Sequence, residues 1–365
     1  MKHAFSSTDH AMMARALRLA ERGAYTTRPN PMVGCVIARD GDVVGEGWHQ
    51  RAGGAHAEVL ALRDAGERAR GATAYVTLEP CAHHGRTPPC VDALIESGVV
   101  RVVAALRDPF PQVAGNGFER LREAGIVVES GLMEAQARAI NRGFLSRIER
   151  GRPWLRIKLA MSLDGRTALG NGESKWITGE AARADVQHWR ARAGAILTGS
   201  GTVLADDPRL TARVPETDIA PVLRVVLDRH LRTTAAGMHL LDGSAPTLFF
   251  HAPGEVPDSR FSNVECEPLP LDENGLSLPA ALQRLGERGI NEIQVEAGPV
   301  LCGALFAQGL ADELLLYIAP LLLGSEARPL LQLPALTDMA ERWKLHVVDE
   351  RKLGPDWRLL LRAAE

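Results

Sequence analysis

The stretch from His56 to Cys90 decides how the first part of this chain folds: H-A-E opens it, and E-P-C-A-H-H-G-R-T-P-P-C closes it from Glu79 onward. Its histidine and two cysteines, His56, Cys81 and Cys90, can fill three of the four positions that a tetrahedral zinc ion prefers. The fourth position remains for a water molecule that the metal acidifies. Glu58 follows the histidine closely enough to move protons without being a ligand. The pattern therefore predicts a catalytic zinc site.

A structural zinc site is the alternative interpretation of the same residues. Such a site usually completes its coordination with a fourth cysteine or histidine at short spacing. His83 or His84 could serve, but the T-P-P-C segment and Glu58 would then have no role. Catalysis is therefore the preferred interpretation.

Both halves of the stretch are expected at helix N-termini. Residues 56–63 have helical character, residues 74–78 form a buried β-rich run, and the prolines at 88 and 89 suit the first turn of a helix over 90–97. Backbone N–H groups and the helix dipole at such a terminus favour the thiolate form that a metal needs.

The chain around this stretch alternates helices and strands. The expected elements are, in order, helix 9–22 ending at Gly23, strands 35–37 and 43–48 around a turn at Asp40-Gly41, strand 99–106, helix 118–124 and strand 126–129. This alternation predicts an α/β domain in which helices sandwich a sheet.

Length and composition indicate a two-domain protein that acts on a small molecule. A chain of 365 residues exceeds the usual size of a single core. Its 45% hydrophobic and 24% charged residues are typical of a soluble globular protein. The net charge of -3 gives no general attraction to nucleic acid or to an anionic membrane, so neither is expected as a partner.

The sequence favours a cytoplasmic location. Residues 1–20 lack the apolar core of a secretory signal, and the longest apolar run, 314–323, is interrupted by Pro320 and is expected to be a buried strand. Five cysteines in a chain of this length do not make a disulfide framework. Three of them have no ligand spacing and are expected to be buried: Cys35, Cys266 and Cys302. A homo-oligomer remains open.

A polar, basic segment over 143–153 is the best linker candidate, which places the domains at residues 1–147 and 148–365. The second domain again alternates strands and helices. The expected strands are 154–161, 196–198, 223–228 and 292–296; the expected helices are 180–193, 278–288 and 303–308; and 253–274 is expected to be a surface connection. The second domain is therefore also α/β.

The second domain lacks the dinucleotide-binding fingerprint. G-S-G-T-V-L at 199–204 has two of the required glycines and no third, so the Rossmann pattern is not met. E-A-G-P at 296–299 follows a strand and precedes a helix, where free backbone N–H groups suit a phosphate. Each Gly-rich turn alone is more often structural.

The first domain resembles a known family of zinc enzymes. Zinc deaminases carry H-x-E followed by P-C-x-x-C, but here eight residues separate Cys81 from Cys90. The order N-P-x-V-G, G-x-x-H, H-A-E and P-C-x-H-x-G-x-T-P-P-C resembles the deaminase half of the bifunctional riboflavin-biosynthesis deaminase/reductases. The resemblance implies a cytidine-deaminase-like α/β/α sandwich that binds one zinc ion per chain through His56, Cys81 and Cys90.

The same resemblance implies roles for single residues in the first domain. Glu58 is the proton donor and acceptor, and Asn30 and His49 lie at positions near the pyrimidine. His83 and His84 also match motif positions, although each could equally be a surface histidine.

The second domain resembles the reductase half of the same family, which is similar to dihydrofolate reductase in fold and uses NADPH. The stretches that carry the resemblance are K-L-A-M-S-L-D-G-R-T-A from 158, G-E-S-K-W-I-T from 172, L-T-G-S-G-T-V-L-A-D-D-P-R-L-T-A-R from 197 and V-E-A-G-P-V-L from 295. The implied NADPH positions are Ala160, Trp176, Thr202, Asp206, Arg229, Gly298, Pro299, Val300, Leu301, Cys302, Gly303 and Ala304. The implied substrate positions are Ser174, Arg190, Leu210, Arg213 and Glu296.

Arg190 and Arg213 suit a sugar phosphate, because a guanidinium binds phosphate oxygens bidentately. Surface ion pairing is the commoner role of an arginine taken singly. No catalytic side chain for hydride transfer can be assigned.

The family resemblance implies two consecutive reactions. The first is deamination of 2,5-diamino-6-(ribosylamino)pyrimidin-4-one 5'-phosphate, and the second is reduction of the ribosyl side chain to ribityl by NADPH. A nucleobase or tRNA deaminase with a non-catalytic second domain is the alternative, but it predicts a basic groove and the short P-C-x-x-C loop, and the chain has neither. A zinc-stabilised binding protein without turnover is a third hypothesis, under which Glu58 would be dispensable.

Overall fold

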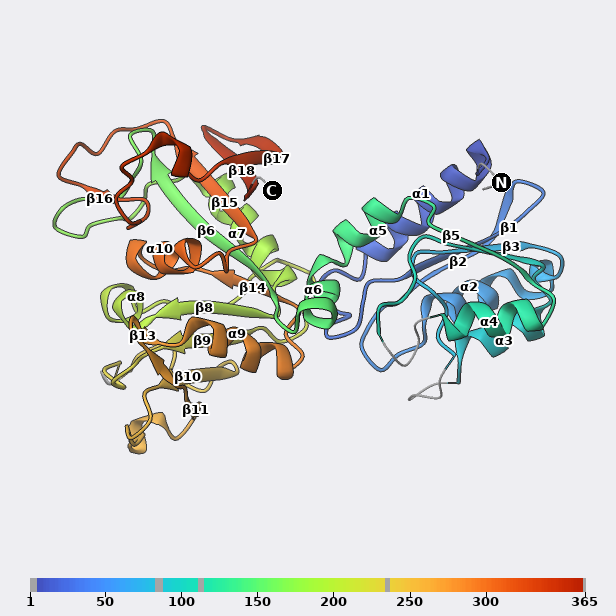
Figure 1. The fold of residues 1–365 in the computed structure, drawn as a ribbon, viewed down its shortest axis with the longest axis horizontal. Coiled ribbons are helices and arrows are strands. Elements are labelled where there is room, and N and C mark those ends of the chain that lie inside the picture. The colour runs from blue at the N-terminus through green and yellow to red at the C-terminus, as the bar shows by residue number, and fades with distance from the viewer. Residues whose placement is uncertain (1–4, 83–87, 111–114, 234–236, 364–365) are drawn as a thin grey trace. The chain divides into compact units, whose positions relative to one another are not determined.

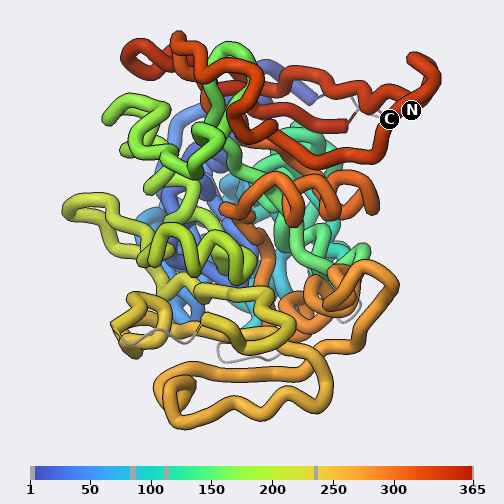
Figure 2. The backbone as a smooth tube through the Cα atoms, turned by 90° about the vertical axis from the view of Figure 1, so that its left-hand side faces the viewer, coloured from blue at the N-terminus to red at the C-terminus, as the bar shows by residue number. Residues whose placement is uncertain are grey.

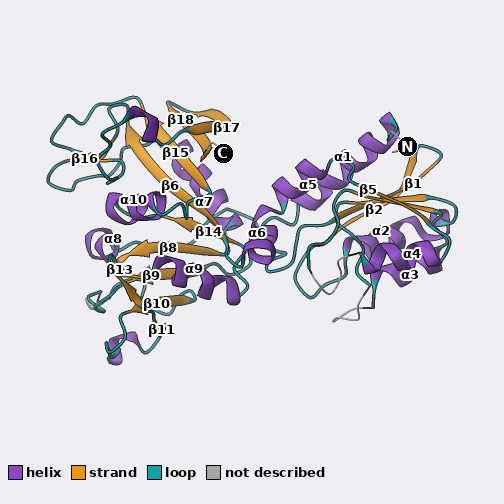
Figure 3. Cartoon of the chain, in the orientation of Figure 1, coloured by secondary structure: helices purple, strands orange, loops and turns teal. Residues whose placement is uncertain are grey.

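The computed structural model describes residues 5–82, 88–110, 115–233 and 237–363 (Figure 1). The chain forms two compact units, Met1–Gly151 and Arg152–Glu365. Each unit contains one main sheet with helices packed on it (Figure 3), so the predicted α/β class is confirmed for both. No helix in the described ranges is long and apolar enough to span a bilayer.

Unit 1 is built on a five-stranded sheet with the order β2-β1-β3-β4-β5. Its strands are β1 (Gly34–Arg39), β2 (Asp42–Trp48), β3 (Thr73–Val76), β4 (Arg101–Ala104) and β5 (Val127–Ser130). β1 pairs antiparallel with β2 and β3, whereas β3, β4 and β5 run parallel. The predicted hairpin turn has left-handed φ values of 52° at Asp40 and 91° at Gly41, which suit a two-residue hairpin loop.

Helices cover both faces of this sheet. The first face carries α1 (Ser7–Glu21), α5 (Glu134–Ile140) and α6 (Arg142–Arg150), and the second carries α2 (Ala57–Ala65), α3 (Cys90–Ser97) and α4 (Asn116–Glu123). A short 3-10 turn, Gly66–Ala69, follows α2. On the first face Met13 and Leu17 pack against Phe144, and on the second Ala61 packs near Leu94. This layering is the predicted sandwich.

The segment expected to be a linker is largely helix α6. Phe144 and Leu145 are buried in the first-face core, whereas Glu149 and Arg150 at the end of the helix are exposed. The basic composition predicted a linker, but the segment also carries the apolar side of an amphipathic helix.

Unit 2 is built on a nine-stranded sheet with the order β11-β10-β9-β8-β14-β6-β15-β18-β17. Its strands are β6 (Trp154–Ser162), β8 (Ala195–Gly199), β9 (Leu223–Leu227), β10 (Thr247–His251), β11 (Glu265–Pro268), β14 (Glu292–Val295), β15 (Glu313–Ala319), β17 (Leu345–Leu353) and β18 (Asp356–Ala363). The strands from β11 to β15 run parallel, and β18 and β17 are antiparallel additions. Figure 2 shows the β17–β18 hairpin in red and the β11 segment in orange at opposite edges of the sheet.

The remaining elements of unit 2 surround this sheet. Its helices are α7 (Glu180–Arg192), α8 (Ser200–Asp206), α9 (Leu278–Glu287) and α10 (Pro299–Ala307). The shorter elements are β7 (Arg166–Ala168) with β16 (Arg328–Pro329), β12 (Leu271–Asp272) with β13 (Gly275–Leu276), and two 3-10 turns at Ser259–Phe261 and Met339–Glu341. The expected surface connection over 253–274 was wrong in part, because it contains β11, a half-exposed edge strand.

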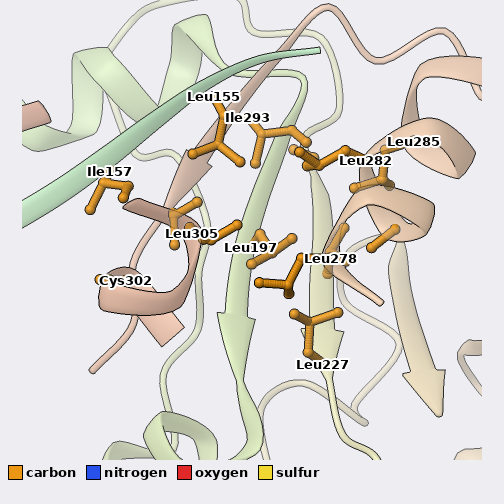
Figure 4. Close-up of a cluster of buried hydrophobic side chains, with 14 of the residues drawn as sticks. Leu155, Ile157, Leu197, Leu227, Leu278, Leu282, Leu285, Ile293, Cys302 and Leu305 are labelled. Carbon is orange, nitrogen blue, oxygen red and sulfur yellow. The ribbon is translucent and has the colours of Figure 1, made fainter. Parts of the chain in front are cut away.

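The two faces of the large sheet differ in chemistry. One face is apolar: Leu155, Leu197 and Ile293 pack against Leu282 of α9 and Leu305 of α10 (Figure 4). The face that α7 covers carries charges. There the fully buried Arg156 bonds Glu292 at 2.9 Å and Glu313 at 3.0 Å, and Trp189 of α7 lies 4.4 Å from its guanidinium. Buried charges of this kind are tolerated because each is paired.

Candidate functional site

The three predicted zinc ligands meet in unit 1 at the ends of different elements. His56 is the residue before α2, Cys81 lies five residues after the end of β3, and Cys90 is the first residue of α3. One ligand atom from each residue lies within 4.8 Å of the others. This is the only such cluster of histidine, cysteine and carboxylate groups among the residues that the structure describes.

The spacing of the three donor atoms fits zinc. His56 Nδ1 lies 3.1 Å from Cys90 Sγ and 3.5 Å from Cys81 Sγ. A tetrahedral zinc ion with Zn–S bonds of about 2.3 Å and a Zn–N bond of about 2.0 Å separates its ligands by roughly 3.5 Å. One nitrogen and two sulfurs at this spacing leave one coordination position, as the sequence predicts for a catalytic site.

The surroundings of the cluster favour a thiolate beside a buried carboxyl group. Hydrogen bonds lower the pKa of Cys81 to about 4, with that to Cys90 the largest contribution and those to His56 and the Cys90 backbone following, although burial opposes them. Glu58 is 3% exposed in the first turn of α2. Burial, and secondly the Cys81 thiolate, raises the pKa of Glu58 to about 7. A carboxyl group in such a setting can both accept and donate a proton.

Asn30 and His49 lie beside the metal ligands. The His49 ring stands edge-on to that of His56, with centroids 5.5 Å apart. His49 Nδ1 lies 3.1 Å from the Ala55 carbonyl oxygen, and its Nε2 lies 3.1 Å from Asn30 Nδ2. Burial lowers the pKa of His49, so we assign a neutral ring that donates from Nδ1 and accepts the Asn30 amide at Nε2.

The remaining predictions concern two histidines that follow Cys81 in the sequence and the three other cysteines of the chain. His83 and His84 lie outside the described residues. Cys35 on β1 and Cys302 on α10 are buried as expected, whereas Cys266 on the edge strand β11 is only half-buried.

Several of the predicted cofactor and substrate residues of unit 2 lie at the carboxyl ends of its parallel strands. Ala160 lies near the end of β6, Thr202 and Asp206 lie on α8 directly after β8, Arg229 follows β9, and Glu296 follows β14. Because these strands are parallel, their carboxyl ends meet at the same edge. Ligands of open parallel sheets bind at this edge.

The residues from Gly298 to Ala304 form the start of α10. Gly298 precedes the helix, Pro299 is its first residue, and the helix begins four residues earlier than the predicted 303. The predicted helix was too short because Gly298 and Pro299 suggested a loop, whereas proline is favoured in a first helical turn. The free N–H groups of that turn lie at the carboxyl end of β14, as a phosphate site requires.

Glu296 is the centre of a buried charged group at this edge. Arg190 of α7 donates from Nε to Glu296 Oε1 at 2.6 Å and from Nη2 to Oε2 at 2.7 Å. Although burial opposes it, the charges of Arg190 and Lys158 and a hydrogen bond from Gln294 lower the pKa of Glu296 to about 2. Glu296 is therefore a fixed carboxylate.

Lys158 lies in one of the stretches that carry the family resemblance, but the resemblance implies no role for it. Burial lowers the pKa of this lysine, with the Glu296 charge opposing the shift. A charged residue on a mainly apolar strand was the available signal, which Arg156 on the same strand shares.

Arg213 differs from Arg190 in its surroundings. Arg190 already donates from three nitrogens to Glu296 and to the Thr211 carbonyl oxygen, whereas Arg213 is exposed and its Nη1 donates to Thr211 Oγ1 at 2.9 Å. Burial, and then the charges of Arg190 and Arg209, lower the pKa of Arg213. Arg213 thus lies within electrostatic reach of two other arginines and of the Glu296 carboxylate, which leaves positive charge for an anion.

The remaining predicted residues of unit 2 differ in exposure. Trp176 is 70% exposed and lies under the Arg183 guanidinium at 4.8 Å. Ser174 is half-buried, Arg229 is exposed, and Leu210 is buried with a left-handed φ of 47°.

Two family models match the chain, one in each unit. Residues 6–106 match the cytidine and deoxycytidylate deaminase zinc-binding region, and residues 153–359 match the RibD C-terminal domain.

Individual relatives match over nearly their whole length. Riboflavin biosynthesis protein RibD of Escherichia coli (strain K12) is 51% identical, over 95% of this chain and 97% of the relative. That of Haemophilus influenzae is 48% identical, over 97% of each.

Solved structures show the same architecture. The structure of Acinetobacter baumannii RibD, form 1, is 44% identical with a TM-score of 0.91, covering 98% of this chain and 99% of that one. A diaminohydroxyphosphoribosylaminopyrimidine deaminase/5-amino-6-(5-phosphoribosylamino)uracil reductase from Thermotoga maritima is 34% identical with a TM-score of 0.86, over 98% and 99% of the two chains. The predicted fold of both units is confirmed.

Proposed function

Because this chain belongs to the RibD family of riboflavin biosynthesis proteins, we propose how its residues divide the family's two reactions between the two units. The chain is a bifunctional enzyme, a deaminase with a zinc-binding domain and an NADPH-dependent reductase. We assign deamination to residues 1–147 and reduction to residues 148–365.

In unit 1 we assign His56 Nδ1, Cys81 Sγ and Cys90 Sγ as the zinc ligands. Zinc supplies the Lewis acidity that makes water nucleophilic at neutral pH. Glu58 takes the proton from that water and delivers it to the departing amino group of 2,5-diamino-6-(ribosylamino)pyrimidin-4-one 5'-phosphate. His49 fixes Asn30 through one amide N–H, so the rest of that amide can orient the pyrimidine.

In unit 2 we assign the first turn of α10 to the phosphates of NADPH, together with Ala160, Thr202 and Asp206 at the same sheet edge. NADPH supplies the hydride. Arg213 binds the substrate phosphate, Arg190 holds the Glu296 carboxylate in place, and Glu296 faces the substrate with Ser174 and Leu210. Trp176 is exposed enough to stack on the cofactor, and Arg229 follows β9 at the same edge.

The donor spacing of His56, Cys81 and Cys90 carries the deaminase assignment. The test supplies the diaminopyrimidine phosphate with and without NADPH, and with and without a zinc chelator. Ammonia release should require zinc and be independent of NADPH, whereas NADPH oxidation should require the deaminated product. Ammonia release that survives complete removal of zinc would overturn the assignment.

A nucleobase or tRNA deaminase with a non-catalytic second domain is not favoured. Unit 2 matches the reductase family model over residues 153–359, and the predicted cofactor residues share one sheet edge. A small-molecule substrate is consistent with both observations.

We further propose that the protein is a cytoplasmic homo-oligomer. The cytoplasm suits a site that depends on thiolate ligands. The oligomer follows from strand β17, the last of the nine-stranded sheet, whose Leu345, Val347 and Val348 are 36–51% exposed. An edge strand whose first half is mainly apolar and exposed, as Leu345 to Val348 is here, favours pairing with a second copy of itself.

A further inference from the structure

Glu79 is a buried carboxylate that lies two residues before the proposed ligand Cys81. It is 3% exposed, and no lysine, arginine or histidine in the described part of the chain pairs with it. Its oxygens accept four backbone N–H groups: those of Gly115 at 2.9 Å, Gly117 at 3.1 Å, Asp108 at 3.2 Å and Phe118 at 3.4 Å. A buried charge is costly unless it is hydrogen-bonded, so these four contacts are strongly favoured. Through them Glu79 fixes the segment that contains Cys81 to the start of α4.

Gly117 allows α4 to lie directly against the metal-binding segment. A Cβ atom at this position would come 2.1 Å from the Pro80 carbonyl oxygen, which is too close for any side chain. Phe118 and Leu121 of α4 also share a buried cluster with Val91 and Leu94 of α3. Helix α4 is therefore packed against the residues on either side of the cysteine pair.

Arg120, one turn further along α4, contacts both ends of the same segment. Its Nη1 donates to the Ala82 carbonyl oxygen at 3.0 Å, directly after Cys81. Its Nη2 pairs with Asp92 in the first turn of α3, the helix that begins with Cys90. One guanidinium thus joins the residue after the first cysteine to the helix that starts with the second.

We propose that Glu79 and Arg120 are positioning residues of the zinc site, which act through α4 to hold Cys81 and Cys90 at the spacing that the metal requires. The inference rests on the proposed zinc ligands. Partners that orient ligands from outside commonly change metal affinity by about 10- to 100-fold. A dithiolate held at the right spacing loses little conformational freedom on binding, so zinc should leave it slowly.

The test measures zinc release from the full-length, zinc-loaded protein to the coloured chelator 4-(2-pyridylazo)resorcinol, at a temperature where every variant is folded. Glu79→Gln turns an amide N–H₂ toward backbone donors, and should release zinc about 10-fold faster or more. Arg120→Ala should give a smaller acceleration, because its side chain is 41% exposed. Glu119→Gln and Arg122→Ala change exposed residues of the same helix and should leave the rate unchanged.

Cobalt(II) substitution separates positioning from a merely structural role. Lost stability alone lowers the unfolding midpoint but leaves the cobalt absorption bands of the folded protein unchanged, whereas altered sulfur positions shift them. Arg120→Lys, which can keep one of the two contacts, should release zinc at an intermediate rate.

Two outcomes are distinguishable. If the parent holds zinc but Glu79→Gln and Arg120→Ala release it within about twofold of the parent rate and keep its cobalt spectrum, the positioning role is excluded. If the parent binds no zinc, the proposed zinc site itself fails. Should Glu79→Gln not fold, the Arg120 series alone decides between these results.

Discussion

At the scale of single residues, the chemistry of zinc made the ligands predictable. Few residue types bind this metal, so His56, Cys81 and Cys90 were recognisable before any coordinates, and the structure brings their donor atoms together. Glu79 and Arg120 were not recognisable as residues that position the zinc ligands. Glu79 meets Gly115 across 36 positions of sequence, and a glutamate beside a loop carries no sign of such distant partners.

Glu58→Gln should retain zinc and lose ammonia release. The amide cannot carry a proton from water to the leaving group, so kcat for deamination should fall by about 100-fold or more. Zinc content and ammonia production of the purified variant measure the two effects. Glu67→Gln changes an exposed glutamate just after α2 and should be active; activity of Glu58→Gln near that of this control would contradict the proton-transfer role.

Arg213→Ala should impair use of the pyrimidine phosphate far more than binding of NADPH. A lost charge-assisted contact to phosphate is worth about 2 kcal/mol, so KM for the substrate should rise by roughly 30-fold. Steady-state kinetics and NADPH titration measure the two quantities. Arg284→Ala, which changes an exposed arginine on α9, is the control, and equal loss of both affinities would argue against a phosphate contact.

At the scale of elements, periodicity predicted most of the central helices and strands, but it missed the buried strand β10, the short helices α5 and α8, and the strands at the edges of the nine-stranded sheet. α1, α2, α3 and α7 fall within two residues of their predicted bounds, because each has an apolar stripe and a clear end signal. Strands β17 and β18 were not predicted, since β17 is almost wholly exposed and shows no alternation of apolar residues. Strand β11 was not predicted either, because none of its four residues is buried.

Asp9 should make the anchoring of α1 dependent on pH. Burial opposes its ionisation, but hydrogen bonds from Arg101, Ser6 and Tyr75 hold the pKa of Asp9 well below its usual value of 3.8. A depressed carboxyl pKa stabilises the fold above pH 4, and this stabilisation is lost as pH falls further. Asp9→Asn should therefore cost about 2 kcal/mol at pH 7 and progressively less below pH 4.

Denaturant unfolding of unit 1 at pH 7 and at pH 3 measures this difference. Glu21→Gln, at the exposed end of the same helix, should change neither value. A penalty for Asp9→Asn that is the same at both pH values would show that its charge is not responsible.

At the scale of the whole molecule, the division into two catalytic units followed from length and from two sets of motifs. The resemblance carried both assignments, because spacing alone left a structural zinc site and a non-catalytic second domain open. The exposed edge of unit 2 could not be predicted, since exposure depends on which strand ends the sheet.

Val347→Lys should convert the proposed oligomer to a monomer. A charge on an exposed edge strand opposes edge-to-edge pairing. Light scattering after size-exclusion chromatography gives the mass of parent and variant. Val127→Lys alters a valine of similar exposure, 57%, on the edge strand β5 of unit 1, and should leave the mass unchanged. If Val127→Lys gave a monomer and Val347→Lys did not, the interface would lie on unit 1 instead.

The strand order of unit 2 also has a consequence during synthesis. β6 is the first strand of its sheet to leave the ribosome, yet its two neighbours are β14 (Glu292–Val295) and β15 (Glu313–Ala319). At about 5–20 residues per second, β6 waits roughly 7–30 seconds for them. All strands of unit 1 are complete by Ser130. The nascent chain therefore completes the strands of unit 1 while β6 still lacks both of its neighbours, and an unpaired, mainly apolar strand of this kind is prone to aggregate.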